Sequence, residues 1–335
     1  MRNKVTLSDV AKVAGVSRAT VSLVIRKSPL VAEATRAKVS RVMADLDYVR
    51  DIGAARLRDK HSHTVGVVVP NLVNSFFTEF LSGVEQVMGE SDRVVLLANS
   101  HDDPVRQAEI LRRFRGHGVD GVILCPAQET SPELIARLAQ WDLPLVQSLR
   151  EIGDAASDFA GGDYISAVDL AIRHLVDQGH QRIAFLSVCA RTSARIERLE
   201  GFARALAQTG AQDAGIVDAE LTWEGAARSA KQILALASKP TAVLCFNDVL
   251  AAGLMVGLRR AGVIPGRDIA VVGLDDLPLA ELTYPPLSSV AMSPDAIGAA
   301  AARLLARRIA DPTAAIQRSI VAPNLQMRGS SARII

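Results

Sequence analysis

The sequence predicts a small helical headpiece followed by a larger α/β body made of two parallel-sheet subdomains. Three observations carry this prediction. Residues 6–25 have the pattern of two short helices joined by a glycine turn. Beyond residue 63, short apolar runs alternate with amphipathic helical stretches, as in a parallel sheet covered on both faces. The part before residue 60 also has a positive net charge, whereas the rest of the chain has a negative one.

The first two helices are delimited by capping residues. Thr6 is placed to cap the first helix, with Asp9 three residues later at its positive dipole end. Gly15 supplies the positive φ that ends this helix, and Ser17 caps the second. The apolar faces are expected to consist of Val10, Val13 and Ala14 on the first helix and Val21, Val24 and Ile25 on the second.

The second helix then exposes a face without carboxylates, made of Arg18, Ala19, Ser22 and Leu23, with Thr20 close by. Guanidinium, hydroxyl and small apolar groups suit a major groove lined by phosphates. The alternative is an ordinary helical hairpin inside a protein core.

The charge distribution favours DNA binding over a core hairpin. Residues 1–60 contain thirteen Lys and Arg against six Asp and Glu, a net charge of +7, and the remainder has a net charge of −5. The near-neutral total of +2 therefore hides a basic head on an acidic body. This asymmetry is typical of a nucleic-acid-binding module joined to a domain of another kind.

A third helix is expected over residues 33–46, followed by a charged linker over residues 49–62. The apolar runs that follow are predicted to be buried parallel strands. They cover residues 64–69, 93–98, 119–124, 143–148, 182–187, 241–246 and 268–273. Residues 150–162 lack a helical period, and this break predicts two subdomains that meet at a crevice.

Several classes of protein are not indicated by the sequence. The N-terminus has no apolar signal-peptide core, and no run approaches the roughly 20 apolar residues of a membrane span. Cys125, Cys189 and Cys245 lie far apart, as expected of reduced cysteines in a cytoplasmic protein. Phosphate-binding glycine loops and metal-ligand spacings are absent, so we expect no enzyme activity, metal or cofactor.

Open parallel sheets bind ligands at the carboxyl ends of their strands. The predicted strands are followed by polar, charged and aromatic residues. These are Asn71, Ser75, Phe76, Phe77, His101, Asp102, Arg150, Arg191 to Arg198, Asn247, Asp248, Asp275 and Asp276. Together they predict a site for a polyhydroxylated or heterocyclic small molecule.

The chain resembles the lactose-repressor family of bacterial transcription regulators over nearly its whole length. The most specific segment is 6–25, followed by 31–39 and 46–48. The body adds the landmarks Asn74-Ser-Phe-Phe, Val119-Asp-Gly-Val-Ile-Leu, Gly179-His-Gln-Arg-Ile-Ala-Phe, Arg198-Leu-Glu-Gly-Phe, Pro240-Thr-Ala-Val, Asn247-Asp, Gly273-Leu-Asp-Asp and Arg328-Gly-Ser.

The resemblance implies a helix-turn-helix headpiece over 1–48, a hinge over 49–62 and a periplasmic-binding-protein-like effector domain over 63–335. The N-subdomain is expected to be about 63–160 plus 292–320, and the C-subdomain about 161–291 plus 321–335. It also implies a dimer on a pseudo-palindromic operator. The chain ends soon after Arg328-Gly-Ser without a heptad tail, so a homodimer is expected.

For DNA, the resemblance implies that Arg18 reads a guanine and Ala19 contacts a thymine methyl, while Thr6, Ser17, Thr20 and Ser22 hold phosphates. Leu23 departs from the basic or polar residue that is common in the family.

In the hinge, Leu57 stands at the position of a leucine that wedges into the minor groove, next to Arg56. Arg50 and Asp51 replace the usual Pro-Asn pair, and Ala55 stands where arginine is usual.

For the effector, the resemblance implies a site made of Phe77, Arg150, Asp163, Arg198, Trp223, Asn247 and Asp275. Arg150 adds a second cation to this set, which makes an acidic sugar possible.

The implied function is a repressor of a carbohydrate operon, regulated by a sugar or a sugar derivative. The alternatives are a purine-responsive co-repressed regulator, a periplasmic-type solute-binding protein, an enzyme of sugar or nucleoside metabolism and a nonspecific architectural DNA binder.

Overall fold

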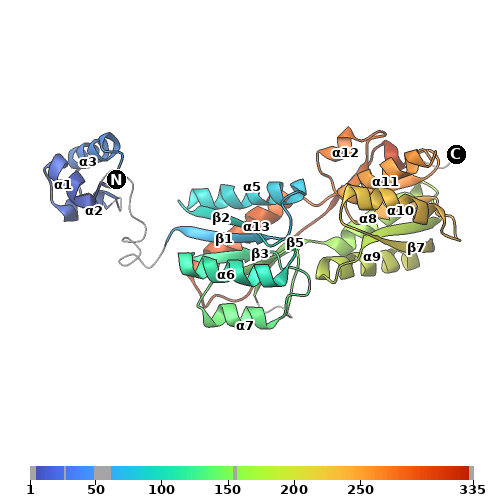
Figure 1. Cartoon of the computed structure of the whole chain (residues 1–335), viewed down its shortest axis with the longest axis horizontal. Coiled ribbons are helices and arrows are strands. Elements are labelled where there is room, and N and C mark those ends of the chain that lie inside the picture. Colours follow the sequence, from blue (N-terminus) through green and yellow to red (C-terminus); the bar gives the residue numbers. More distant parts are fainter. Residues whose placement is uncertain (1–4, 26–27, 49–61, 154–156, 332–335) are drawn as a thin grey trace. The chain divides into compact units, whose positions relative to one another are not determined.

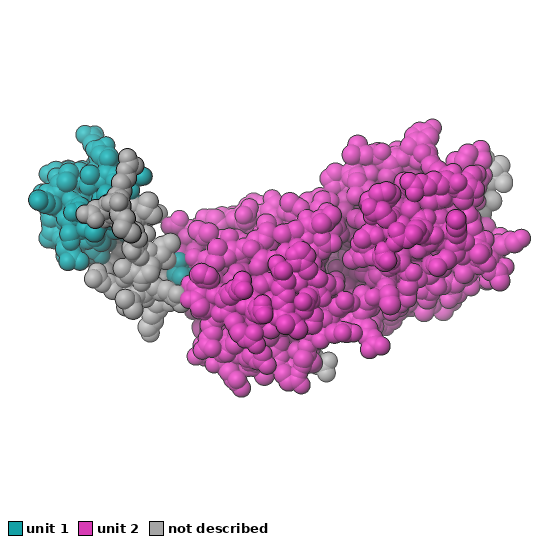
Figure 2. Space-filling model, viewed as in Figure 1, with its two compact units in different colours: residues 1–62 teal, residues 63–335 magenta. Residues whose placement is uncertain are grey.

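The computed structural model describes residues 5–25, 28–48, 62–153 and 157–331. It contains two compact units, residues 1–62 and 63–335 (Figure 2). Arg56 and Leu57, predicted to contact DNA, lie outside the described residues.

Unit 1 contains the helices α1 (Leu7–Ala14), α2 (Arg18–Ile25) and α3 (Glu33–Asp45). The predicted caps are confirmed. Thr6 and Asp9 form a reciprocal capping box, and Gly15 ends α1 with a φ of 65°. The N–H of Thr20 donates to the Ser17 hydroxyl at 3.0 Å, which starts α2.

The apolar face predicted for α1 is wrong at Val13. The buried residues of this helix are Val10, Ala11 and Ala14, whereas Val13 is 58% exposed. At 3.6 residues per turn, Val13 projects about 100° away from the middle of the stripe formed by the other three. Ala11 therefore faces the neighbouring helices together with Val10 and Ala14, and Val13 does not.

The first sheet of unit 2 consists of six parallel strands in the order β11-β5-β4-β3-β1-β2. They are β1 (Thr64–Val69), β2 (Val94–Asn99), β3 (Gly121–Leu124), β4 (Leu145–Ser148), β5 (Asp158–Gly162) and β11 (Arg318–Val321). The helices α5 (Ser75–Glu90) and α13 (Pro294–Ala310) cover one face, and α6 (Pro104–His117) and α7 (Glu133–Gln140) the other (Figure 1). This layer structure is the N-subdomain.

Alternate residues of β1 enter different cores. Val67 packs with Phe80 in the cluster under α5 and α13, whereas Val68 packs with Phe114 in the cluster under α6 and α7. Both faces of the strand are therefore buried, as its continuous valine run predicts. The helices α5 and α13 approach closely, because a Cβ on Gly298 would lie 2.0 Å from the carbonyl oxygen of Phe80.

The second sheet forms the C-subdomain in the order β12-β10-β9-β8-β6-β7, parallel except where β10 meets β12. Its strands are β6 (Arg182–Val188), β7 (Gln212–Ala219), β8 (Ala242–Cys245), β9 (Ala270–Asp275), β10 (Ser288–Ala291) and β12 (Asn324–Gln326). Its helices are α8 (Tyr164–Asp177), α9 (Ser193–Thr209), α10 (Trp223–Leu234), α11 (Asp248–Arg260) and α12 (Leu279–Leu282), with a final 3-10 turn η1 (Gly329–Ser331).

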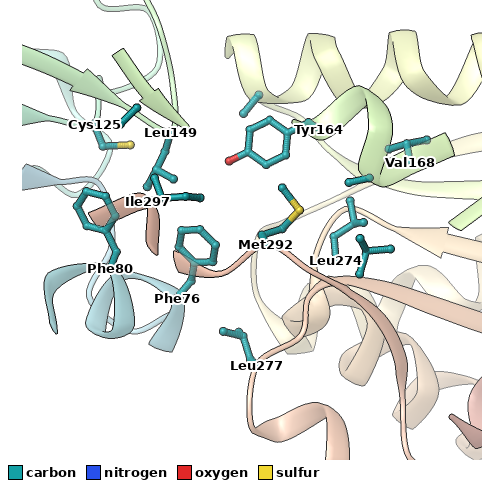
Figure 3. Close-up of a cluster of buried hydrophobic side chains, with 14 of the residues drawn as sticks. Phe76, Phe80, Cys125, Leu149, Tyr164, Val168, Leu274, Leu277, Met292 and Ile297 are labelled. Carbon is teal, nitrogen blue, oxygen red and sulfur yellow. The ribbon is translucent and has the colours of Figure 1, made fainter. Parts of the chain in front are cut away.

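The chain crosses between the subdomains after β5, between β10 and α13, and between β11 and β12. Strand β5 extends to Gly162, two residues past the boundary expected from the sequence. A buried cluster continues across the junction, where Met292 lies between Phe76 of one subdomain and Leu274 of the other (Figure 3). The two lobes therefore share part of their core.

Candidate functional site

The exposed face of α2 carries the residues predicted to contact DNA. Arg18 and Ala19 are exposed, and Val21 and Val24 fix the helix to the buried core of unit 1. Ser22 and Leu23 are both half-buried, and Leu23 packs against that core, so the prediction that these two stay exposed is wrong. A leucine side chain is long enough to fold back over the apolar stripe beside it.

The hydroxyl groups predicted to hold phosphates also serve the capping network of this unit. Thr6 donates to the carboxylate of Asp9 at 2.6 Å, and the hydroxyls of Ser17 and Thr20 lie 2.9 Å apart. Ser22 is half-buried on α2. A hydroxyl has a single O–H to donate. Thr6 therefore has to give up its bond to Asp9 before it can donate to a phosphate, whereas one of the Ser17 and Thr20 hydroxyls keeps a free O–H.

Unit 2 contains a cavity of about 370 Å³ between its subdomains. It opens at the carboxyl ends of the strands, where the fold brings together loops that are far apart in the sequence. Its lining consists of Pro70, Asn71, Asn74, Phe76, Phe77, His101, Asp102, Cys125, Leu149, Arg150, Tyr164, Ala194, Arg198, Leu221, Phe246, Asn247 and Asp275.

Five of the seven predicted effector residues line this cavity: Phe77, Arg150, Arg198, Asn247 and Asp275. The other two do not. The Asp163 carboxylate caps α8, where it accepts from the N–H of Ser166 at 2.9 Å and from its hydroxyl at 2.7 Å. The Trp223 side chain is 46% exposed at the first turn of α10.

The lining residues that were not predicted include two aromatic side chains, Tyr164 and Phe246. Phe246 follows β8 directly, and this position at the end of a predicted strand was the signal that could have identified it. Tyr164 follows β5, a strand that was not predicted, so no comparable signal pointed to it. In Figure 3 the hydroxyl of Tyr164 points toward the N-subdomain.

Arg150 already has a counter-ion inside the cavity. Its Nη1 forms an ion pair with Asp102 and also donates to the carbonyl oxygen of Pro126 at 3.2 Å. The same Asp102 oxygen accepts from the N–H of Gln128 at 3.0 Å. The positive charge of Arg150 is therefore balanced without a ligand.

Arg198 is held differently, because its guanidinium group lies over two aromatic rings. Its Cζ lies 3.8 Å from the ring centre of Tyr164 and 4.2 Å from that of Phe246. Its Nη1 donates to the carbonyl oxygen of Ala194 at 2.9 Å. This arrangement fixes a buried cation in one orientation at the cavity wall.

Asp275 ends β9 with a φ of 117°, and Asp276 follows with a φ of 55°. These conformations are uncommon for residues other than glycine and mark a backbone held by its surroundings. Burial raises the pKa of Asp275 well above its usual value, the nearby Asp248 raises it further, and Arg198 opposes the shift. The Asp275 side chain is thus stabilised in its neutral form.

Asp248 holds the loop at residues 275–277 in place through hydrogen bonds to its carboxylate. One of its carboxylate oxygens accepts from the N–H of Leu277 at 2.8 Å, and the other accepts from the Ser289 hydroxyl. The Ser289 oxygen in turn accepts from the N–H of Asp276 at 3.1 Å. Burial raises the pKa of Asp248 to about 7, although these hydrogen bonds oppose the shift.

We expect Asp248→Asn to change how stability depends on pH. The folded state keeps a proton on Asp248 that the unfolded state releases above about pH 4, so folding stability falls as pH rises from there to about 7. In the variant the free energy of unfolding should not show this decrease, which is on the order of 1–4 kcal/mol. Thermal unfolding of the variant and the wild type at pH 4 to 8 measures the difference. The exposed Asp92→Asn is the control, and identical pH profiles for Asp248→Asn and the wild type would contradict the assignment.

Within the described residues, no group of His, Cys, Asp and Glu is arranged to hold a metal ion. The same residues include no helix long and apolar enough to cross a membrane. Cys125 and Cys245 are buried free cysteines, and Cys189 is an exposed one.

Comparison with known proteins identifies both parts of the chain. The model for "Bacterial regulatory proteins, lacI family" matches residues 6–51, and the model for "Periplasmic binding protein-like domain" matches residues 172–331. The transcriptional repressor PurR of Photobacterium profundum is 34% identical over 314 residues, which cover 91% of this chain and 92% of the relative.

Two further proteins are similar over almost the full length. The ribose operon repressor of Escherichia coli K12 is 33% identical and covers 97% of this chain and 99% of its own. The solved lac repressor dimer, bound to operator and the anti-inducer ONPF, superposes with a TM-score of 0.88. It is 25% identical and covers 98% of this chain and 100% of its own.

Proposed function

Because the chain belongs to the lacI family of bacterial regulatory proteins, we propose that it is a transcriptional repressor of a carbohydrate operon, controlled by a sugar or sugar derivative. It acts as a homodimer in the cytoplasm, binds an operator through unit 1 and binds the effector in the cavity of unit 2. The observation that carries the proposal is that one chain joins an exposed Arg18 on a helix-turn-helix to a cavity lined by Arg198 and Asp275.

The headpiece supplies the DNA-binding surface. Arg18 reads a guanine at each half-site, Ala19 contacts a base edge, and the hydroxyls of Thr6, Ser17 and Thr20 hold the backbone phosphates. A homodimer presents two such helices to the two halves of a pseudo-palindrome. The similarity to the lac repressor dimer bound to operator supports this arrangement.

The polar lining of the cavity suits a sugar. Arg198 lies over the rings of Tyr164 and Phe246, and the half-buried Phe77 offers a further ring at the cavity wall. Asn247 and Asp275 add polar atoms that suit hydroxyl groups. The ribose operon repressor is among the relatives, in agreement with a sugar effector.

A purine is the second candidate for the effector. The relative PurR is 34% identical over most of both chains, and the Phe77 ring is one surface on which a base could stack. An effector of either class would act in the same way, because a ligand that touches both subdomains favours one arrangement of the lobes. The operator affinity then changes by the same factor as the effector affinity.

A thermal-shift screen of the full chain against neutral sugars, sugar acids, nucleosides and purine bases tests the proposal. A true effector at 100 times its dissociation constant adds about 2.7 kcal/mol of stability. For a chain of this size we expect a rise of roughly 5 °C or more in the midpoint. Stabilisation by purines alone would replace the sugar with the second candidate, and stabilisation by none of these would contradict a metabolite site.

A further inference from the structure

Arg328 lies outside the effector cavity but forms an ion pair with the residue next to Asp275. Its Nη1 donates to a carboxylate oxygen of Asp276 at 2.6 Å and to the carbonyl oxygen of Leu287 at 2.9 Å. The side chains of Arg328 and Asp276 are 16% and 17% exposed, so the ion pair is shielded from water on most sides. Neither residue belongs to the cavity lining, whereas Asp275 does. Arg328 can therefore influence the cavity only through another residue.

The backbone that Arg328 holds through Asp276 has two uncommon conformations in succession. Asp275 and Asp276 have φ values of 117° and 55°, and such conformations persist only where the surrounding structure enforces them. The N–H of Asp276 donates to the hydroxyl oxygen of Ser289 at 3.1 Å, and its carboxylate accepts from Arg328. Asp276 is therefore restrained through both its backbone and its side chain. The direction in which the adjoining Asp275 carboxyl group points depends on these restraints.

Arg328 is itself fixed to the buried core of the C-subdomain. Its N–H donates to the hydroxyl oxygen of Ser288 at 2.7 Å, and the same hydroxyl donates to its carbonyl oxygen at 3.0 Å. Ser288 is fully buried at the start of β10. The guanidinium group is held as well, because its Nη2 donates to Glu281 at 3.3 Å. A side chain with a fixed origin and a fixed direction is suited to hold another residue in one orientation.

We propose that Arg328 is a positioning residue for effector binding, which holds Asp276 so that the Asp275 carboxyl group points into the cavity. Arg328 itself does not contact the effector. This inference rests on the proposed function, in which Asp275 binds an effector in this cavity. The alternative is that the ion pair only attaches the segment after β12 to the subdomain. Its loss then lowers the unfolding midpoint but leaves the effector affinity of the folded chain unchanged.

Isothermal titration of the full chain with ribose, galactose, gluconate, adenosine and adenine provides the first test. Any of these compounds that binds the wild type should bind Arg328→Gln about 10-fold more weakly, because the loss of a charge-assisted hydrogen bond releases the loop. Arg328→Lys keeps the charge and should retain part of the affinity. Arg173→Gln removes an ion pair with Asp169 from α8 of the same subdomain, and it should change nothing. Circular dichroism and the unfolding midpoint establish that each variant folds.

Asp276→Asn removes the same ion pair from its other side, and asparagine suits the φ of 55° at this position. It should weaken binding of the same compound to a similar degree, and the double variant should be no weaker than either single variant. Additive losses would show that Arg328 acts by another route and would overturn the inference. Unchanged affinity in Arg328→Gln and Asp276→Asn would overturn it as well and leave the ion pair a purely structural link.

The second test needs no effector, so it separates this inference from the proposed function. NMR of the chain labelled at the aspartate carboxyl carbons follows the titration of Asp275, and Asp275→Asn assigns its signal. Burial raises the pKa of Asp275 well above its usual value. In Arg328→Gln this pKa should fall toward the usual value, because the released carboxyl group turns toward water. An equally raised pKa in the variant would overturn the positioning role. If none of the compounds binds the wild type, the proposed metabolite site fails, and this titration still decides whether Arg328 positions Asp275.

Discussion

Asp275→Ala is expected to remove the effector response while leaving operator affinity unchanged. The carboxyl group is buried at the cavity wall and 5% exposed, and its loss deletes the polar partner of the effector hydroxyls. Two hydrogen bonds of about 1.5 kcal/mol each correspond to a loss of roughly 100-fold or more in effector affinity. Fluorescence anisotropy on labelled operator, with and without effector, measures both properties.

The φ of 117° at Asp275 makes a second variant necessary. Alanine tolerates this conformation poorly, whereas asparagine adopts positive φ values more readily. Asp275→Asn keeps the shape and should lose part of the response, and the exposed Asp213→Ala should lose none. A normal effector response in Asp275→Ala would remove this residue from the site.

Arg18→Ala is expected to weaken binding to the operator far more than binding to random DNA. A bidentate contact to guanine contributes about 1–3 kcal/mol of discrimination, and a dimer makes it twice. The loss of specific affinity is therefore about 30-fold or more. Anisotropy titrations on operator and random duplexes at one fixed salt concentration give the two values.

Arg41→Ala is the matched control for Arg18, because it removes an exposed positive charge from α3 of the same unit. Its effect should be small and equal on both duplexes, as expected for a phosphate contact or none. If Arg18→Ala also lowers both affinities equally, Arg18 holds the backbone and does not read a base.

The helices of unit 1 were predictable because their signals are local. Thr6 with Asp9, Gly15 and Ser17 each act within one turn of chain, and the structure contains the caps and the turn that they predict. The errors at Val13 and Leu23 have a different origin. Which side of a helix faces its neighbours, and how far a long side chain folds back, depend on the packing of all three helices.

Several central strands were predictable for a related reason. Strands buried on both faces appear as continuous apolar runs, and β1, β4, β6 and β8 lie where such runs predict them. The strands β5, β7, β10, β11 and β12 were missed because their patterns are weaker. Strand β5 is the small and polar sequence Asp-Phe-Ala-Gly-Gly, the buried β10 is the short sequence Ser-Ser-Val-Ala, and β7, β11 and β12 contain exposed residues at sheet edges.

In the candidate effector site, too, some features could be predicted from the sequence and others depend on tertiary contacts. The resemblance to a family supplied Phe77, Arg150, Arg198, Asn247 and Asp275, which the structure brings to one cavity. No local pattern could show that Asp102 pairs with Arg150, or that Arg198 lies over the rings of Tyr164 and Phe246. These contacts join loops and helices from different parts of the chain, so they form only in the folded structure.

The measurement that tests the account most directly is the operator affinity of the wild-type dimer at increasing effector concentration. We expect saturating effector to change the dissociation constant by about 5- to 150-fold, with the operator changing the effector affinity by the same factor. An effector that demonstrably binds in unit 2 but leaves the operator dissociation constant unchanged would contradict the coupling of a sensing body to a DNA-binding head.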